Sequence, residues 1–201
     1  MANMVDSKKQ LILSAALESF ADKGFSGTSM RTIAKTANVP LGLIYHYFEN
    51  KEKLWVEVKL SGVQDYFKQD IFDFAPSDSL EEFIRYVVSN RFQFYANNPK
   101  VVRMILWQNL EAGGKPLSGF GKNQAKLKHW IRALDELKKK GKLYSDLDTE
   151  LALFFIINSA SAPYMSSPQP FGGDNKAQKE FQYQNMVIKT LHDGLSAENP
   201  R

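Results

Sequence analysis

Apolar residues recur at helical spacing along almost the whole chain, and no stretch shows the sustained alternation that is typical of a strand. The first helix has an apolar side formed by Leu13, Ala16, Leu17 and Phe20. Gly24 then stands where a residue in the left-handed conformation would end that helix. The pattern therefore predicts an all-α protein of about nine helices.

Two short helices follow the first one. Thr28 or Ser29 can accept hydrogen bonds from the free backbone N–H groups of the second helix. Pro40 suits the first turn of the third helix, because its missing N–H would be unpaired there anyway. Ile44 and Phe48 share the buried side of that helix, and its other side presents Leu41, Gly42, Tyr45 and His46. This arrangement is typical of a helix-turn-helix module, whose last helix enters the DNA major groove.

Longer amphipathic helices fill the rest of the chain. Lys51 begins one that we expect to run to about Phe74, and Gly113 with Gly114 ends another. A later helix closes with a lysine run and Gly141, as helix C-termini favour. The sequence contains no internal repeat.

The eighth helix, Leu151–Ala162, is apolar on more than one side. Its apolar run is too short for a membrane span, so a buried or interfacial helix explains it better. A small domain can hide such a helix only by packing it on both faces. We therefore expect a homodimer built from this helix and the ninth, whose stripe runs from Phe181 to Leu195.

Composition removes several classes of protein. The chain has 201 residues, 43% of them hydrophobic and 24% charged, which is ordinary for a globular protein. It has no Cys, and its three His are far apart in sequence, so no metal and no cofactor is predicted. The net charge of +4 permits a polyanionic partner without requiring one. We expect a cytoplasmic protein with no membrane association.

Residues 11–54 carry the most specific signal. They contain G-F-x-G-T-S-M-R-T-I-A and then A-N-V-P-L-G-L-I-Y-H-Y-F-E-N-K-E-K-L. This segment closely resembles the N-terminal domain of the TetR family of transcriptional regulators. The resemblance implies a helix-turn-helix DNA-binding domain at residues 1–52 and a helical ligand-binding and dimerisation domain at residues 53–201.

The same resemblance implies the residues that contact DNA. It places Thr28 and Ser29 at phosphate-facing caps, Arg31 near a base or phosphate, and Lys51 on a phosphate. The set that faces the groove consists of Pro40, Leu41, Gly42, Tyr45 and His46. Pro40 departs from the Ser that is common in the family, and Leu41 offers only apolar contacts, so Arg31 and His46 are the expected hydrogen-bonding readers. His46 can contact a base or a phosphate.

Gly42 has two interpretations. A glycine inside a helix costs about 1 kcal/mol relative to alanine, so its presence here indicates a close approach to DNA. The alternative is that Gly42 relieves crowding between helices of the protein itself.

A second set of residues is the candidate ligand site of the C-terminal domain. Its members are aromatic or polar side chains in otherwise apolar helices, namely Phe83, Arg91, Trp107, Gln108, Phe120, Trp130, Asn158 and Tyr164. Aromatic residues at helical spacing are more often core, and that alternative stays open. Arg91 lies in the middle of an apolar face, where a buried charge needs a partner. Its guanidinium snorkels to solvent, pairs with a carboxylate such as Glu111, or meets an acidic group of a ligand.

These features favour a ligand-responsive transcriptional regulator, most simply a repressor that a small, largely apolar effector releases from a palindromic operator in double-stranded DNA. A ligand-independent or architectural DNA-binding protein is the alternative. An enzyme is disfavoured, because the segment AGGKPLSGFGK has Phe120 and Gly121 where a phosphate-binding loop needs Lys and Ser or Thr.

Overall fold

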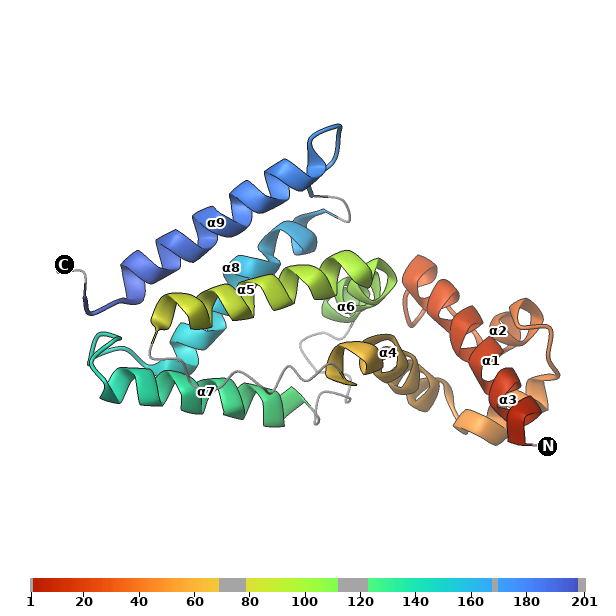
Figure 1. The fold of residues 1–201 in the computed structure, drawn as a ribbon. Coiled ribbons are helices and arrows are strands. Elements are labelled where there is room, and N and C mark those ends of the chain that lie inside the picture. Colours follow the sequence, from red (N-terminus) through yellow and green to blue (C-terminus); the bar gives the residue numbers. More distant parts are fainter. Residues whose placement is uncertain (1, 69–78, 112–122, 168–169, 199–201) are drawn as a thin grey trace. The chain divides into compact units, whose positions relative to one another are not determined.

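The computed structural model describes residues 2–68, 79–111, 123–167 and 170–198. Within these ranges the regular structure consists of nine α-helices (Figure 1), which confirms the all-α prediction. The helices are α1 Ala2–Lys23, α2 Met30–Thr36, α3 Leu41–Phe48, α4 Lys51–Lys68, α5 Leu80–Asn97, α6 Pro99–Glu111, α7 Asn123–Lys139, α8 Thr149–Ser166 and α9 Lys176–Leu195.

These helices form two compact units. The first unit contains α1 to α4 together with α6, and the second contains α5, α7, α8 and α9. This division differs from the one expected after residue 52, because α4 and α6 pack against the N-terminal helices. An apolar stripe shows that a helix is packed, but it does not identify the helix on the other side.

Local signals set most helix ends where the sequence predicts them. Gly24 follows α1 with a φ of +71°, and Gly141 follows α7 with a φ of +72°. Asp148 caps α8 by accepting a hydrogen bond from the Leu151 N–H at 2.9 Å. Two expected boundaries, near Phe74 and at Gly113, lie outside the described residues.

The core of the first unit is built around Trp55 of α4, whose side chain is fully buried. Its ring meets Phe20 edge-on with a centroid separation of 4.9 Å and Phe25 at 5.5 Å. Ile33 of α2 and Ile44 of α3 are also fully buried in this cluster. The first, second, third and fourth helices therefore share one core.

The sixth helix joins this unit through polar as well as apolar contacts with α1. Lys100 forms an ion pair with Glu18, and Trp107 Nε1 donates a hydrogen bond to the Ala21 carbonyl at 3.3 Å. Met104 is fully buried in the same core as Trp55. A helix distant in sequence thus completes the N-terminal unit.

A buried amine lies between α4 and α6. Lys59 Nζ donates a hydrogen bond to Gln108 Oε1 at 2.6 Å, and both side chains are buried. Burial lowers the pKa of Lys59 to about 8, because an ammonium loses its hydration there.

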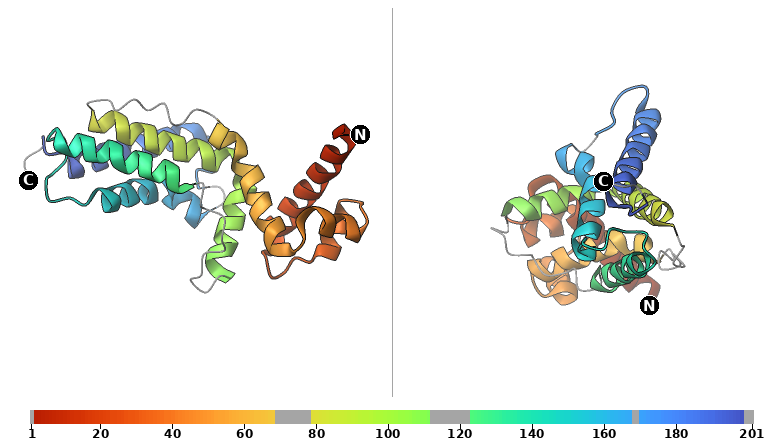
Figure 2. Two further views of the ribbon diagram at one scale, coloured as in Figure 1. Left: turned by 90° about the horizontal axis from the view of Figure 1, so that it is seen from below. Right: turned by 90° about the vertical axis from the view of Figure 1, so that its left-hand side faces the viewer.

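In the second unit, α5 packs against both α8 and α9, and α7 packs against α8. Each view in Figure 2 shows α5 beside α9. The apolar stripe of α5 is fully buried at Phe83, Ile84, Val87 and Val88. An aromatic cluster connects α5, α8 and α9. It consists of Phe92, Tyr95, Tyr164, Phe171 and Tyr183.

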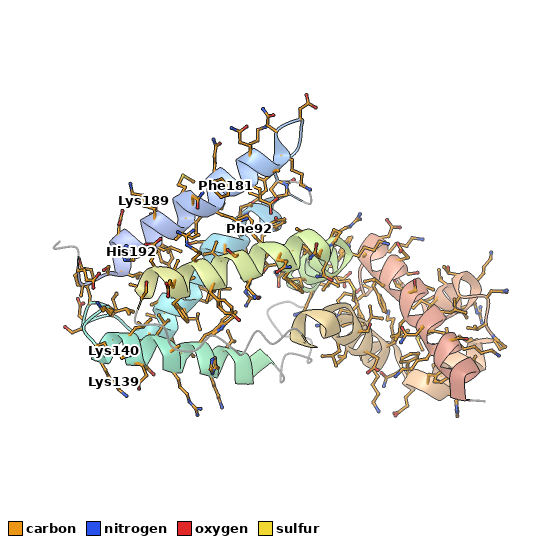
Figure 3. The ribbon with its side chains drawn as sticks, viewed as in Figure 1. Phe92, Lys139, Lys140, Phe181, Lys189 and His192 are labelled. Atoms are coloured by element: carbon orange, nitrogen blue, oxygen red, sulfur yellow. The ribbon has the colours of Figure 1, made fainter. Side chains whose placement is uncertain are left out.

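The eighth helix keeps one apolar side uncovered. Leu151, Phe154 and Phe155 are 68%, 65% and 56% exposed, respectively, although Ile156 next to them is fully buried. On α9, Phe181 is 66% exposed, whereas Phe92 of α5 is buried; Figure 3 labels both. The expected apolar stripe of α9 is thus divided: Ile188, Leu191 and Leu195 are buried within the chain, whereas Phe181 is exposed.

The uncharged segment of α8 raised the question of a membrane span. None of the helices in the described ranges is long and apolar enough to cross a membrane. Figure 3 shows Lys139 and Lys140 at the end of α7, where both side chains are exposed, as expected for a solvated helix face.

Candidate nucleic-acid interface

The orientation of α2 and α3 follows from the sides that they bury. Ile33 and Ala34 of α2 and Ile44 and Phe48 of α3 point into the core of the first unit. The turn between the helices contains Asn38 with a φ of +52°, a conformation that asparagine tolerates better than most residues. The opposite sides of both helices therefore face outward.

The outer side of α3 carries the set expected to face the groove. Tyr45 is 48% exposed, and Pro40, Gly42 and His46 are exposed as well. Leu41 is half-buried because it packs against the core cluster. The structure thus brings all five residues to one end or side of a single helix.

Gly42 has no packing role among the residues that the structure describes. A Cβ added at this position would meet no heavy atom within 4 Å. The interpretation that Gly42 relieves crowding between helices is therefore wrong. Its cost in helix propensity is therefore not offset by a packing contact among the described residues, and a close approach to DNA stays a prediction.

Ser29 caps α2, but Thr28 does not. The Ser29 side chain accepts a hydrogen bond from the Thr32 N–H at 3.0 Å and is exposed. The Thr28 hydroxyl is buried and donates toward the carbonyls of Gly24 and Ser19, which lie at 2.8 and 3.0 Å. The expectation of a phosphate-facing Thr28 side chain is therefore corrected, because its hydroxyl closes the preceding turn instead.

Lys51 is engaged within the protein. Its Nζ donates to the carbonyls of Phe25 and Thr28 at 2.8 and 2.9 Å, and it lies 4.3 Å from the centre of the Phe25 ring. The ammonium therefore holds the α1–α2 turn, a role that sequence reasoning missed. Arg31 is exposed on α2.

The candidate ligand residues do not form one group. Trp107 and Gln108 belong to the first unit, where they contact α1 and Lys59. Asn158 is exposed and donates to the Phe154 carbonyl of its own helix, so its placement in a pocket is corrected. Phe120 lies outside the described residues. Phe83 and Tyr164 are buried in the core of the second unit.

Arg91 and Trp130 do come together in the second unit. The Arg91 Cζ lies 5.7 Å from the centre of the Trp130 ring, within the range of a cation–π contact. Arg91 Nε is buried and has no hydrogen-bond acceptor among the described residues. The Glu111 carboxylate, a candidate partner of Arg91, accepts from the backbone N–H groups of Phe25 and Ser26.

The hydroxyl of Tyr164 lies beside a carboxylate. Its hydroxyl lies 3.4 Å from Glu180 Oε1. Burial, together with the Glu180 carboxylate, raises the pKa of Tyr164 well above its ordinary value. Tyr164 therefore remains a neutral hydrogen-bond donor at physiological pH.

Two sequence profiles match the chain. The profile described as "Bacterial regulatory proteins, tetR family" matches residues 12–58, and the one described as "Tetracyclin repressor-like, C-terminal domain" matches residues 85–191. The chain is 29% identical over 156 residues to the HTH-type transcriptional repressor KstR2 of Mycolicibacterium smegmatis, which covers 75% of this chain and 74% of that protein.

Two further proteins are similar to this chain. The HTH-type transcriptional regulator RutR of Escherichia coli O157:H7 is 29% identical over 164 residues, covering 76% of this chain and 71% of that protein. The solved structure of the ketosteroid transcriptional regulator KstR2 of Mycobacterium tuberculosis superposes with a TM-score of 0.69 and 23% identity, covering 94% of this chain and 95% of that one.

The outward-facing α3, the tight turn and the buried inner sides define a helix-turn-helix DNA-binding protein with a second helical unit. The chain belongs to the TetR family of bacterial transcriptional regulators. Members of this family are regulators rather than enzymes, bind DNA and small-molecule effectors, and are typically dimers.

Gly42→Ala separates stability from DNA binding. Alanine should stabilise α3 by up to about 1 kcal/mol and raise the thermal midpoint by roughly 2–4 °C. It should also weaken binding to a DNA duplex that the wild-type protein selects from genomic fragments, by about tenfold or more. The reason is that the added methyl group occupies the space where α3 approaches the DNA most closely. Calorimetry and fluorescence anisotropy measure the two effects.

Gly194→Ala is the matched control for this change. Gly194 is also helical, and an added Cβ there would meet nothing within 4 Å. This variant should keep the DNA affinity of the wild type. Equal DNA affinities for both variants would contradict a close approach at Gly42.

Proposed function

We propose that this chain is a repressor that binds an approximately palindromic operator as a homodimer and is released by a small, largely apolar effector with an acidic group. The relative KstR2 is named a repressor, which supports the direction of regulation. The observation that carries DNA binding is the outward side of α3, with exposed Tyr45 and His46 around a Gly42 that no internal contact requires.

The proposed contacts divide into two kinds. Tyr45 offers a hydroxyl to a phosphate and a ring to a thymine methyl, while Arg31 and His46 supply hydrogen bonds to base edges or phosphates. Ser29 presents the N-terminus of α2 to a phosphate. Lys51 adds a positive charge near the same turn, in addition to its internal bonds. Two copies of this helix-turn-helix, related by a two-fold axis, require two related half-sites in the DNA.

Arg31→Ala tests base reading directly. Duplexes are first selected from genomic fragments with the wild-type protein, and a scrambled duplex serves for comparison. Loss of a base contact should cost about 1–3 kcal/mol on the selected duplex and much less on the scrambled one. Lys35→Ala removes the same charge from an exposed position of the same helix and should leave this preference intact. Identical preferences in both variants would contradict base contact by Arg31, and failure of the wild type to retain any duplex would contradict DNA binding itself.

The uncovered apolar side of α8 supports the homodimer. Leu151, Phe154 and Phe155 lie at helical spacing on one side, and all are more than half exposed. A monomer would leave this apolar surface in water, whereas a two-fold interface covers the same patch on both copies. Phe181 and Met186 of α9 extend the exposed apolar surface. Ile188 is buried within its own chain and belongs to the core rather than to this surface.

Phe155→Glu should convert the dimer to a monomer at micromolar concentration. Two-fold symmetry introduces the charge twice in one interface, where it would lose its hydration. Sedimentation equilibrium measures the mass, and operator affinity should fall with it. Gln93→Glu introduces the same side chain at an exposed position of α5 and should stay dimeric. A wild-type monomer, or a dimeric Phe155→Glu variant, would contradict the interface.

Arg91 is the proposed anchor for an acidic group of the effector. Its buried Nε lacks an acceptor among the described residues, and a carboxylate is the acceptor that a guanidinium binds best. Trp130 stacks near the same guanidinium and is fully buried, so its ring adds an apolar surface beside the charge. The site thus combines one cation with aromatic surroundings.

Arg91→Met tests this anchor with straight-chain carboxylic acids and their methyl esters as probes. The wild type should be stabilised more by an acid than by its ester in a thermal shift assay, and the variant should lose that preference. Arg85→Met removes an exposed arginine of the same helix and should retain it. A lower unfolding midpoint with unchanged acid preference would assign Arg91 a structural role. Release of the wild type from a bound DNA duplex by the same probes is a second assay. No response to any probe in either assay would favour a ligand-independent regulator.

A further inference from the structure

The turn between α1 and α2 is bonded to the last residue of α6. Glu111 Oε2 accepts from the Phe25 N–H at 2.9 Å and from the Ser26 N–H at 3.2 Å, and Oε1 lies 3.3 Å from the same Ser26 nitrogen. These residues are 86 and 85 positions apart in sequence. Hydrogen bonds to an ionised acceptor are stronger than those between neutral groups. One carboxylate therefore satisfies two consecutive backbone donors of the turn.

Gly24 shows how closely α6 is seated on this turn. A Cβ at Gly24 would lie 2.4 Å from Glu111 Oε1 and 2.9 Å from the Trp107 ring. Its φ of +71° also favours glycine. Trp107 Nε1 donates to the Ala21 carbonyl one turn earlier. Both the backbone conformation and the space at Gly24 thus fit the contact with α6.

The same turn is held from its carbonyl side by Lys51. That ammonium donates to the carbonyls of Phe25 and Thr28. Phe25 therefore donates its N–H to the Glu111 carboxylate and accepts at its C=O from the Lys51 ammonium. Ser29, the N-cap of α2, follows directly. The position at which α2 begins therefore depends on how this turn is fixed.

We propose that Glu111 is a positioning residue for DNA binding: its carboxylate fixes the α1–α2 turn and so sets the placement of α2 and α3. The proposal rests on the DNA-binding function and adds to it a residue that lies outside the helix-turn-helix. Removal of the carboxylate frees two backbone donors and loosens the start of α2. The arrangement makes α6, which the chain enters from α5, a direct determinant of the DNA-binding surface.

The test is the affinity of Glu111→Ala for a duplex selected with the wild-type protein. Loss of a negative charge should by itself tighten binding to DNA, because it lowers the repulsion of phosphates. The positioning role requires the opposite sign, and we expect affinity to fall tenfold or more. Glu111→Gln retains one acceptor oxygen and should give an intermediate affinity.

Asp22→Asn is the matched control. Asp22 is an exposed acid of α1 that faces Arg103 of α6 at 3.9 Å, so this variant removes the same charge from the same pair of helices without touching the turn. It should bind the duplex as tightly as the wild type or more tightly. If Glu111→Ala behaves like Asp22→Asn, the positioning role is overturned.

Amide hydrogen exchange supplies a readout that does not depend on DNA. In Glu111→Ala, exchange at the Phe25 and Ser26 amides should accelerate tenfold or more, while the Ala37 amide, which bonds to the Ile33 carbonyl at the far end of α2, should remain protected. Equal acceleration at all three amides would show general destabilisation and overturn the proposal. If the wild type retains no duplex, the DNA-binding function fails. If the wild type binds and Glu111→Ala binds equally well, only the role of Glu111 fails.

Discussion

Burial of one side of α2 and α3 against α1 and α4 is the constraint on which the DNA-binding surface depends. Ile33, Ile44 and Phe48 occupy the same core as Trp55, so neither short helix can rotate about its axis without exposing them. Successive residues of an α-helix are about 100° apart, so a shift of one residue would move Tyr45 out of the exposed surface. The outward side of α3 is therefore a consequence of what the inward side packs against.

The polar backbone groups of the α1–α2 turn impose a second requirement. The turn is half-buried at Phe25 and exposed at Ser26, and its own backbone does not supply partners for all of its N–H and C=O groups. Here Glu111 bonds the N–H groups and Lys51 bonds the carbonyls. Lys51, which the family resemblance assigns to a phosphate, and Glu111 of the distant α6 thus both stabilise this turn. The unit that carries the helix-turn-helix consequently contains more than its first three helices.

The second unit departs from simple burial rules at two places. It leaves large apolar side chains of α8 in solvent, and it buries part of Arg91 without an acceptor among the described residues. Native proteins keep such departures mainly where they have a functional reason. The first fits a second copy of the chain, and the second fits an acidic ligand. Both departures are physical costs that binding would remove.

The sequence by itself determined the helices, several of their ends and the class of protein. Periodicity, glycine and proline positions and capping residues are local signals, and the motif around Tyr45 is contiguous, so one chain was enough to read them. Only the tertiary structure decided which helices share a core, that Thr28 is buried while Ser29 caps, and that Glu111 bonds to Phe25. An apolar stripe has the same pattern whether a neighbouring helix covers it or not, which is why Phe181 and Ile188 could not be separated. Contacts between residues far apart along the chain are set by packing in three dimensions, and no local pattern encodes them.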